Sequence, residues 1–247
     1  KIRNLEKYKY VISDNLIEIL KLRPDSWITG SFFWHYAIEK LPLETIEKCN
    51  EIIEKFPPNL ICSNLFIPPY FNQYKNLNKV GLYSFKKENL IRFSKKKGLL
   101  ISCGQGGLLK EKFLEFVNKI EKPENLKKIW IEPSLYNNKM PKYIVPATFD
   151  SNMYNQISAA IIRPGIGTIT ECLQHAIKIF SLTEQGNDEM EFNSKVLVKN
   201  NLGCKIKSLS SVFDEVNKFL FNKKKHNLFE KSLNLLDFDG ANQTVKI

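Results

Sequence analysis

Short, wholly apolar runs alternate along the chain with stretches whose apolar residues recur every three or four positions. The runs at 99–101 and 159–162 are too short for an amphipathic helix and lack polar side chains, which is typical of buried parallel strands. Residues 108–120 follow the first run and have helical spacing of their apolar residues (Leu109, Phe113, Phe116, Val117 and Ile120). This alternation predicts an α/β fold with parallel sheets.

The N-terminal part of the chain has the same alternation. Strands are expected at 9–13, 26–30, 60–64 and 78–82, and helices at 15–22 and 43–56. A run of charged residues at 86–97 then predicts a domain boundary. Strand–helix alternation continues to about residue 222, and a last amphipathic run follows at 226–236. We therefore expect domains at 1–94 and 95–222 and a C-terminal segment at 223–247.

The strand at 159–162 leads through a glycine-rich turn directly into a helix. Gly165 and Gly167, which follow a proline, predict a tight turn where the backbone can approach a ligand. Thr168 lies in the opening turn of the helix, whose free amides and positive dipole end attract a phosphate. Glu171 lies one turn inside, where a carboxylate can accept hydrogen bonds from a sugar diol. The segment therefore indicates a nucleotide site.

Glycine turns also occur in α/β proteins that bind no ligand, so one turn alone leaves a purely architectural role open. A second glycine-rich turn, at 102–107, follows the strand at 99–101. In an open parallel sheet, ligands bind outside the carboxyl ends of the strands, where neighbouring turns converge. The two turns together favour nucleotide binding.

Composition is typical of a globular enzyme. The 247 residues are 43% hydrophobic, enough for one large domain or two smaller ones. No run approaches the roughly 18 apolar residues of a membrane span, and no secretory signal is recognisable. The cysteines lie far apart with no CxxC pair, which favours reduced thiols and a cytoplasmic location. The three histidines lack metal-ligand spacing, so no metal site is expected.

The formal net charge is +11, but only four of the 37 basic residues are arginines. Scattered lysines without arginine forks and interleaved aromatic residues do not favour nucleic acid as a partner. Peripheral contact with anionic lipid stays open, at about 1 kcal/mol for each well-placed lysine. The sequence gives no indication of the oligomeric state.

Four motifs, in order along residues 97–222, resemble the donor-binding half of GT-B glycosyltransferases, most closely the MurG-like branch (glycosyltransferase family 28 type). They are Ser-Cys-Gly-Gln-Gly-Gly at 102–107, the run at 143–154, an arginine-to-glutamate signature at 163–171, and an acidic loop ending in asparagine at 184–193. The resemblance implies a GT-B fold of two Rossmann-like domains with parallel sheets. It also implies that the C-terminal helix crosses back to the first domain.

The resemblance further implies roles for single residues. Glu171 would bind the ribose, and Phe149 would lie near the base. The residues that would contact the diphosphate are Gly104, Gln105, Gly106, Gly165, Gly167 and Thr168. Those that would contact the donor sugar are Glu189, Met190 and Asn193. Arg163 would clamp a donor phosphate or pair with a carboxylate that sets the angle between the domains. At 189 and 190 the family has two glutamines, and neither residue here can donate as an amide does. The identity of the transferred sugar therefore stays open.

The family's first domain has further strand–helix units before a strand end like Ile12-Ser-Asp14. The resemblance thus implies that the first domain here is incomplete and lacks a region that in many relatives holds the catalytic base. His35 and Asp14 are the candidate bases that remain. His35 can equally be a packed histidine, and Asp14 a cap for the helix that follows it.

These features predict an inverting, metal-independent glycosyltransferase without a cofactor. It would move a sugar from a UDP-sugar, or another nucleotide sugar, to a cell-envelope or lipid-linked acceptor. One alternative is a nucleotide-sugar hydrolase or epimerase on the same fold, which product analysis without an acceptor would reveal. Another is a donor-binding subunit that needs a separate partner at the membrane.

Overall fold

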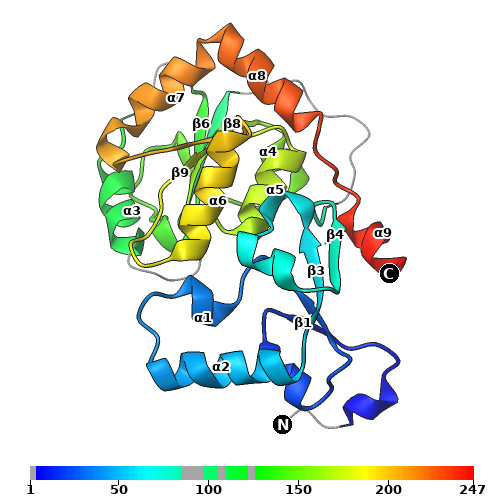
Figure 1. The fold of residues 1–247 in the computed structure, drawn as a ribbon. Helices are drawn as coiled ribbons and strands as arrows, with labels where there is room; N and C mark the ends of the chain where they lie inside the picture. The colour runs from blue at the N-terminus through cyan, green and yellow to red at the C-terminus, as the bar shows by residue number, and fades with distance from the viewer. Residues whose placement is uncertain (1–3, 85–96, 105–108, 122–125) are drawn as a thin grey trace. The chain divides into compact units, whose positions relative to one another are not determined.

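The computed structural model describes residues 4–84, 97–104, 109–121 and 126–247. The chain forms two compact units, coloured along the sequence in Figure 1. The first holds residues 1–83, 186–192 and 237–247, and the second holds 84–185 and 193–236. This division differs from the expected one because 186–192 belongs to the first unit and 223–236 to the second. The expected boundary at 86–97 lies almost entirely outside the described residues.

The first unit contains a four-stranded parallel sheet in the order β1-β2-β3-β4. Its strands are β1 (Ile12–Asp14), β2 (Trp27–Thr29), β3 (Asn59–Ser63) and β4 (Leu77–Val80). Its helices are α1 (Trp34–Ala37), α2 (Leu43–Lys55) and α9 (Gly240–Val245), with 3-10 turns at Leu5–Lys7, Ile17–Lys21, Asn64–Phe66 and Pro69–Gln73. Helix α2 is amphipathic, and it buries Ile52 and Ile53 in a core that also holds Leu20, Ile28 and Leu60.

The helix expected at 15–22 is a 3-10 helix limited to Ile17–Lys21. Asn15 has a left-handed backbone (φ 56°), which turns the chain between Asp14 and the helix. Leu16 therefore takes the N-cap position with no side-chain cap, and Asp14 stays exposed. The expectation that Asp14 caps this helix is wrong.

The last residues of the chain pack at the end of β4. The Gln243 side chain accepts a hydrogen bond from the Gly81 N–H at 2.8 Å, and the hydroxyls of Tyr83 and Thr244 are 2.8 Å apart. Gly240 approaches so closely that a Cβ there would lie 2.2 Å from the Gly81 carbonyl oxygen. Only a glycine fits this contact.

The second unit contains a six-stranded parallel sheet in the order β10-β9-β8-β5-β6-β7. Its strands are β5 (Gly98–Ser102), β6 (Lys128–Ile131), β7 (Ile144–Pro146), β8 (Ile157–Ile162), β9 (Lys178–Ser181) and β10 (Gly203–Lys205). Counted from β5, this is the strand order 6-5-4-1-2-3 of the Rossmann fold. The order reverses between β5 and β8, the two strands that the sequence predicts to precede glycine turns.

The helices of the second unit connect the strands of this sheet or, for the last two, follow its final strand. They are α3 (Leu109–Asn118), α4 (Ser151–Tyr154), α5 (Ile166–Gln174), α6 (Asp188–Lys199), α7 (Val212–Leu220) and α8 (Lys223–Leu233), with 3-10 turns at Pro133–Leu135 and Leu209–Ser211. Every residue of β5 and β8 is buried, which confirms the reading of their apolar runs as strands covered on both faces. The first turn of α6 is counted with the first unit and the rest with the second.

Candidate nucleotide site

Two turns lie side by side at the carboxyl ends of β5 and β8. The strands pair in parallel up to Ser102 opposite Ile162, and the Arg163 N–H donates to the Ser102 carbonyl at 3.1 Å. The chain leaves both strands at the point where the strand order reverses. In α/β sheets this point is the preferred place for a ligand.

The turn after β8 leaves open space in front of helix α5. Gly165 is the N-cap, and the first helical hydrogen bond runs from the Ile169 N–H to the Gly165 carbonyl at 3.0 Å. The amides of Ile166, Gly167 and Thr168 therefore have no carbonyl partner within the helix. A Cβ added at Gly165 or Gly167 would meet no atom within 4 Å. Neither glycine has a positive φ, so each acts through its missing side chain rather than through a special backbone conformation.

The turn after β5 is organised by Glu132, which the sequence analysis did not identify. One oxygen of this buried carboxylate accepts hydrogen bonds from the Ser102 hydroxyl (2.8 Å) and from the N–H groups of Cys103 (2.9 Å) and Gly104 (2.8 Å). The Gly104 amide, which the resemblance assigns to the diphosphate, thus donates to a protein carboxylate in this structure. A signal was present in the sequence: Glu132 follows an apolar strand at the same sheet edge as the glycine turns.

Gly104 itself has a left-handed backbone (φ 69°), which favours glycine. Gln105 and Gly106, the next expected contacts, lie outside the described residues. Burial, followed by the nearby Glu132 carboxylate, raises the pKa of the Cys103 thiol to about 11. Cys103 is therefore a protonated core side chain at neutral pH.

Arg163 connects the two turns. Its guanidinium Nη2 lies 3.7 Å from the Glu184 carboxylate, and its Nη1 lies 3.7 Å from the position of a Cβ on Gly104. The Nε atom is buried and has no hydrogen-bond partner among the described residues. The structure thus brings Arg163 beside the glycine turns and pairs it with a carboxylate of the same unit.

Glu171 lies in α5 and is half-buried. Its carboxylate accepts a hydrogen bond from the Gln174 side chain at 2.5 Å. The backbone carbonyl of Glu171 lies 2.9 Å from Nδ1 of His175, whose buried ring stacks on Tyr154 with the centroids 4.8 Å apart. Glu171 is therefore held at the edge of the site by its own helix.

Phe149, in the loop after β7, has a left-handed backbone (φ 53°) and a side chain that is 43% exposed. A bulky residue in this conformation costs about 1–3 kcal/mol, which the surrounding structure must offset. The next residue supplies an anchor, because the Asp150 carboxylate accepts from the Met153 N–H at 2.8 Å and caps α4. This hydrogen bond lowers the pKa of Asp150. The loop thus holds an aromatic ring outward.

The expected donor-sugar residues are divided between different environments. Asn193 is fully buried, and its side-chain amide donates to the Pro164 carbonyl at 3.0 Å, which ties α6 to the turn after β8. Met190 is only 1% exposed, so its side chain is a packing residue. Glu189 is half-buried, and it belongs to the segment counted with the first unit.

The two candidate bases lie in the first unit. His35 is 5% exposed and stacks on Phe33, with the ring centroids 5.7 Å apart and an interplanar angle of 7°. Burial lowers the pKa of His35. These features of His35 fit the alternative that it is a packed histidine rather than a base. Asp14 ends β1 and is exposed.

Among the described residues, no group of three His, Cys, Asp or Glu side chains could hold a metal ion. Within the same ranges, no helix combines the length and the apolar character needed to cross a bilayer.

No protein-family model matches the chain, and no curated protein matches it by sequence. Solved structures match it by fold. MurG from Acinetobacter baumannii aligns at a TM-score of 0.54 and 14% identity, over 93% of this chain and 75% of that one. The fold is that of the GT-B glycosyltransferases.

Two other GT-B matches contain nucleotides. The spinosyn rhamnosyltransferase SpnG, complexed with thymidine diphosphate, aligns at a TM-score of 0.58 and 11% identity, over 90% of this chain and 68% of that one. LpCGTa, in complex with UDP, aligns at a TM-score of 0.55 and 14% identity, over 91% of this chain and 64% of that one. The chain spans 75%, 68% and 64% of the lengths of these three structures.

Proposed function

We propose that this chain is a GT-B glycosyltransferase that binds a nucleotide sugar, preferably a UDP-sugar, and transfers the sugar with inversion and without a metal. The acceptor would be a cell-envelope or lipid-linked molecule. The observation that carries the proposal is the pair of turns at β5 and β8, which flank the reversal of strand order and open onto the free amides of α5. The nucleotide complexes of two fold neighbours support it.

In this proposal the diphosphate lies in front of α5. The amides of Ile166, Gly167 and Thr168 would donate to its oxygens, and the positive end of the helix would favour its charge. Arg163, already beside both turns, would add a cation. The same groups would stabilise the negative charge that develops as the nucleoside diphosphate leaves, which is the main electrostatic demand of the reaction.

Glu171 would bind the ribose hydroxyls, and Phe149 would lie against the base. The Gln174 amide orients the Glu171 carboxylate, which can accept hydrogen bonds from a diol. The exposed Phe149 ring offers an aromatic face for a nucleobase.

The acceptor hydroxyl needs a general base to take its proton as it attacks the anomeric carbon. Of the two candidates, only Asp14 has an exposed side chain, and we propose it in preference to His35. If the acceptor is lipid-linked, the net charge of +11 would also favour contact with anionic lipid.

Calorimetric titration of the chain with UDP, dTDP, GDP and CDP, without divalent metal, tests the donor site. We expect one nucleotide to bind, and Glu171→Ala to weaken it by about 1–3 kcal/mol because charge-assisted hydrogen bonds are lost. Glu111→Ala, an exposed acid on α3 of the same unit, is the matched control and should bind normally. Equal affinity of wild type and Glu171→Ala would remove Glu171 from the site. Failure of all four nucleotides to bind would contradict the proposal.

A further inference from the structure

Helix α8 presents a row of apolar and cationic side chains to the solvent. Leu228 lies between Lys224 and Lys231, four and three residues away, so that all three project from one face of the helix. Leu228 is 42% exposed, and both lysines are exposed. The opposite face is buried through Phe229 and Leu233. In Figure 1, α8 lies at the outer border of the second unit.

The row continues past both ends of the helix. Phe221, which follows α7, is 66% exposed, and Leu235, just after α8, is 86% exposed. Together with Leu228 these apolar residues recur every seven positions. Exposed apolar side chains normally lie singly on a protein surface, so a regular row of three indicates a contact. We call the row of Phe221, Lys224, Leu228, Lys231 and Leu235 the α8 surface.

The helix beneath the α8 surface is fixed in place. Phe219 of α7 lies against both Phe229 and His226 of α8, with ring centroids 6.2 and 4.8 Å apart. At the start of α8, the Asn222 side chain accepts a hydrogen bond from the Lys225 N–H at 3.0 Å and caps the helix. The α8 surface is therefore formed before any partner arrives.

Positive charge gathers around the same surface. Residues 218–235 contain five lysines and one acid, Glu230, so the formal net charge of this segment is +4. All five lysines are exposed (Lys218, Lys223, Lys224, Lys225 and Lys231). Clusters of about four to eight basic residues on an amphipathic helix are typical of proteins that bind anionic lipid headgroups.

We propose that the α8 surface docks on a bilayer that contains anionic lipid. Phe221, Leu228 and Leu235 would enter the boundary between headgroups and acyl chains. The lysines between them would place their ammonium groups among the anionic headgroups, while their methylene stems lie along apolar atoms. This inference stands without the proposed function, because it requires neither a nucleotide nor a lipid-linked acceptor.

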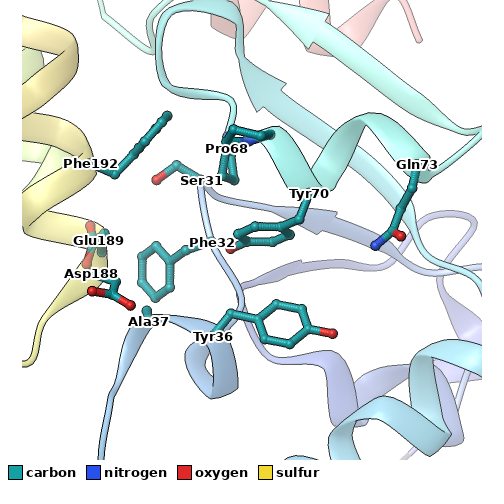
Figure 2. A pocket seen from close by; sticks show the side chains of 11 residues that line it. Ser31, Phe32, Tyr36, Ala37, Pro68, Tyr70, Gln73, Asp188, Glu189 and Phe192 are labelled. Carbon is teal, nitrogen blue, oxygen red and sulfur yellow. The ribbon is translucent and has the colours of Figure 1, made fainter.

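Other occupants fit the α8 surface less well. A second copy of the chain would bring together two segments that each carry a net charge of +4, which is unfavourable. A protein partner would have to bury Lys224 and Lys231 along with Leu228, but lysine is depleted from the cores of protein interfaces. A small molecule needs a concave site, such as the aromatic cavity of the first unit in Figure 2, whereas the α8 surface is the outer face of a helix.

Co-sedimentation of the whole chain with sucrose-loaded vesicles tests this inference. One set of vesicles contains phosphatidylcholine alone, and in the other about one third of the lipid is phosphatidylglycerol, which is anionic. We expect binding to the anionic vesicles and little binding to the neutral ones. Binding should weaken in about 1 M salt, because the ions screen the lysines.

Two double variants separate the apolar part of the α8 surface from its cationic part. Leu228→Gln with Leu235→Gln should weaken binding to the anionic vesicles about tenfold or more, because two apolar side chains can no longer enter the bilayer. Lys224→Gln with Lys231→Gln should weaken it about twentyfold, since each lysine near an anionic bilayer contributes about 1 kcal/mol, a factor of about five. All four side chains are exposed, so both variants should keep the fold.

Two controls are matched to these variants. Lys112→Gln with Lys207→Gln removes two exposed lysines elsewhere in the second unit and makes the same change in net charge. Leu22→Gln replaces a leucine that is 63% exposed in the first unit. Both controls should bind the anionic vesicles within about twofold of wild type.

Several outcomes would overturn the inference: no binding to the anionic vesicles, equal binding to both sets of vesicles, unchanged binding in either double variant of the α8 surface, or equal losses in these variants and the controls. Sedimentation of the chain without lipid tests the second copy as an occupant. We expect the same oligomeric state in wild type and in Leu228→Gln with Leu235→Gln. A wild-type dimer that this variant dissociates would assign the α8 surface to a second copy instead of a bilayer.

Discussion

Glu132 organises the turn after β5 through a single carboxylate oxygen. Three donors converge on this oxygen, one hydroxyl and two backbone N–H groups, and its other oxygen accepts from Ser134 at 3.0 Å. A buried carboxylate with this many donors is well compensated for its loss of water. The start of the turn, from Ser102 to Gly104, is therefore held in shape before any ligand arrives, which is a form of preorganisation.

Replacing Glu132 by alanine should leave these buried donors without a partner. We expect Glu132→Ala to lower the free energy of unfolding by about 1–3 kcal/mol, measured by urea denaturation. Glu132→Gln keeps one acceptor oxygen and should retain most of that stability. If the alanine variant is as stable as wild type, the carboxylate does not hold the turn.

Sequence patterns predict residue types for the candidate site but not the hydrogen-bond partners of those residues. Asn193 has the polar character that the resemblance assigns to a ligand contact, but its amide binds the Pro164 carbonyl. Gly104 has the expected backbone freedom, but its N–H binds Glu132. The choice of hydrogen-bond partner depends on the distance between segments that are far apart in the sequence, and periodicity carries no information about it.

At the scale of elements, the first turn of α5 combines an exposed glycine with unpartnered amides. Gly167 has an ordinary helical backbone and no neighbour near its missing Cβ. Alanine favours a helix over glycine by up to about 1 kcal/mol, so local stability alone would favour alanine here. The glycine is explained if a ligand must approach this backbone closely.

Gly167→Ala should therefore separate stability from binding. We expect the thermal midpoint to stay the same or rise, and the affinity for the bound nucleoside diphosphate to fall about tenfold or more, since a methyl group would lie between the ligand and the amides. Gly104→Ala is the informative contrast, because φ is 69° there and the substitution should destabilise the fold. Nucleotide affinity equal to wild type in Gly167→Ala would argue against a phosphate at this turn.

Lys178, the first residue of β9, connects three elements of the second unit. Its ammonium lies over the rings of Phe219 in α7 and Phe229 in α8, at 5.2 and 5.1 Å, and donates to the Asn201 carbonyl at 2.6 Å. Burial lowers the pKa of Lys178 from 10.5 to about 8, while the nearby Cys204 raises this pKa and Lys225 lowers it by smaller amounts. The unfolded chain therefore binds more protons than the folded one between these two pH values.

It follows that the free energy of unfolding should rise with pH from about 8 to 10.5 through this group, by up to about 1–3 kcal/mol. Urea denaturation at pH 8, 9 and 10 would measure the rise, and Lys178→Met should remove it. Lys199→Met, an exposed lysine at the end of α6, should leave the rise in place. An identical pH dependence in wild type and Lys178→Met would show that Lys178 is not the titrating group.

Elements with one decisive local signal could be predicted from the sequence. The runs at 99–101 and 159–162 form β5 and β8 because strands buried on both faces need uninterrupted apolar residues. The helix expected at 15–22 failed because one left-handed residue, Asn15, removed its first turn. The spacing of apolar residues carries no information about the backbone dihedral angle of one residue.

At the scale of the whole molecule, the sequence patterns predicted parallel sheets but not the order of their strands. Strand order depends on which crossovers pass over which face, and it was available only through the family resemblance. The grouping of residues 237–247 with the first unit likewise depends on contacts between distant segments, such as that of Gln243 with Gly81. The boundary predicted from the charged run at 86–97 stays a prediction, because that run lies almost entirely outside the described residues.

Gly240 gives a test of this long-range packing. We expect Gly240→Val to lower the free energy of unfolding by about 1–3 kcal/mol, because the new side chain would overlap the Gly81 backbone. Ala241→Val, at the next and exposed position, is the matched control and should have little effect. Thermal unfolding of the two variants measures the difference. Equal midpoints would mean that the C-terminal helix does not depend on this contact.

The chain path also constrains how this protein can evolve by recombination. Residues 186–192 belong to the first unit, but they lie between 84–185 and 193–236, the two parts of the second. A recombination event that replaced the second unit as one continuous gene segment would also replace residues 186–192 of the first unit. One pair of crossovers therefore cannot exchange the second unit and leave the first intact. An intact exchange would need separate replacement of 84–185 and 193–236.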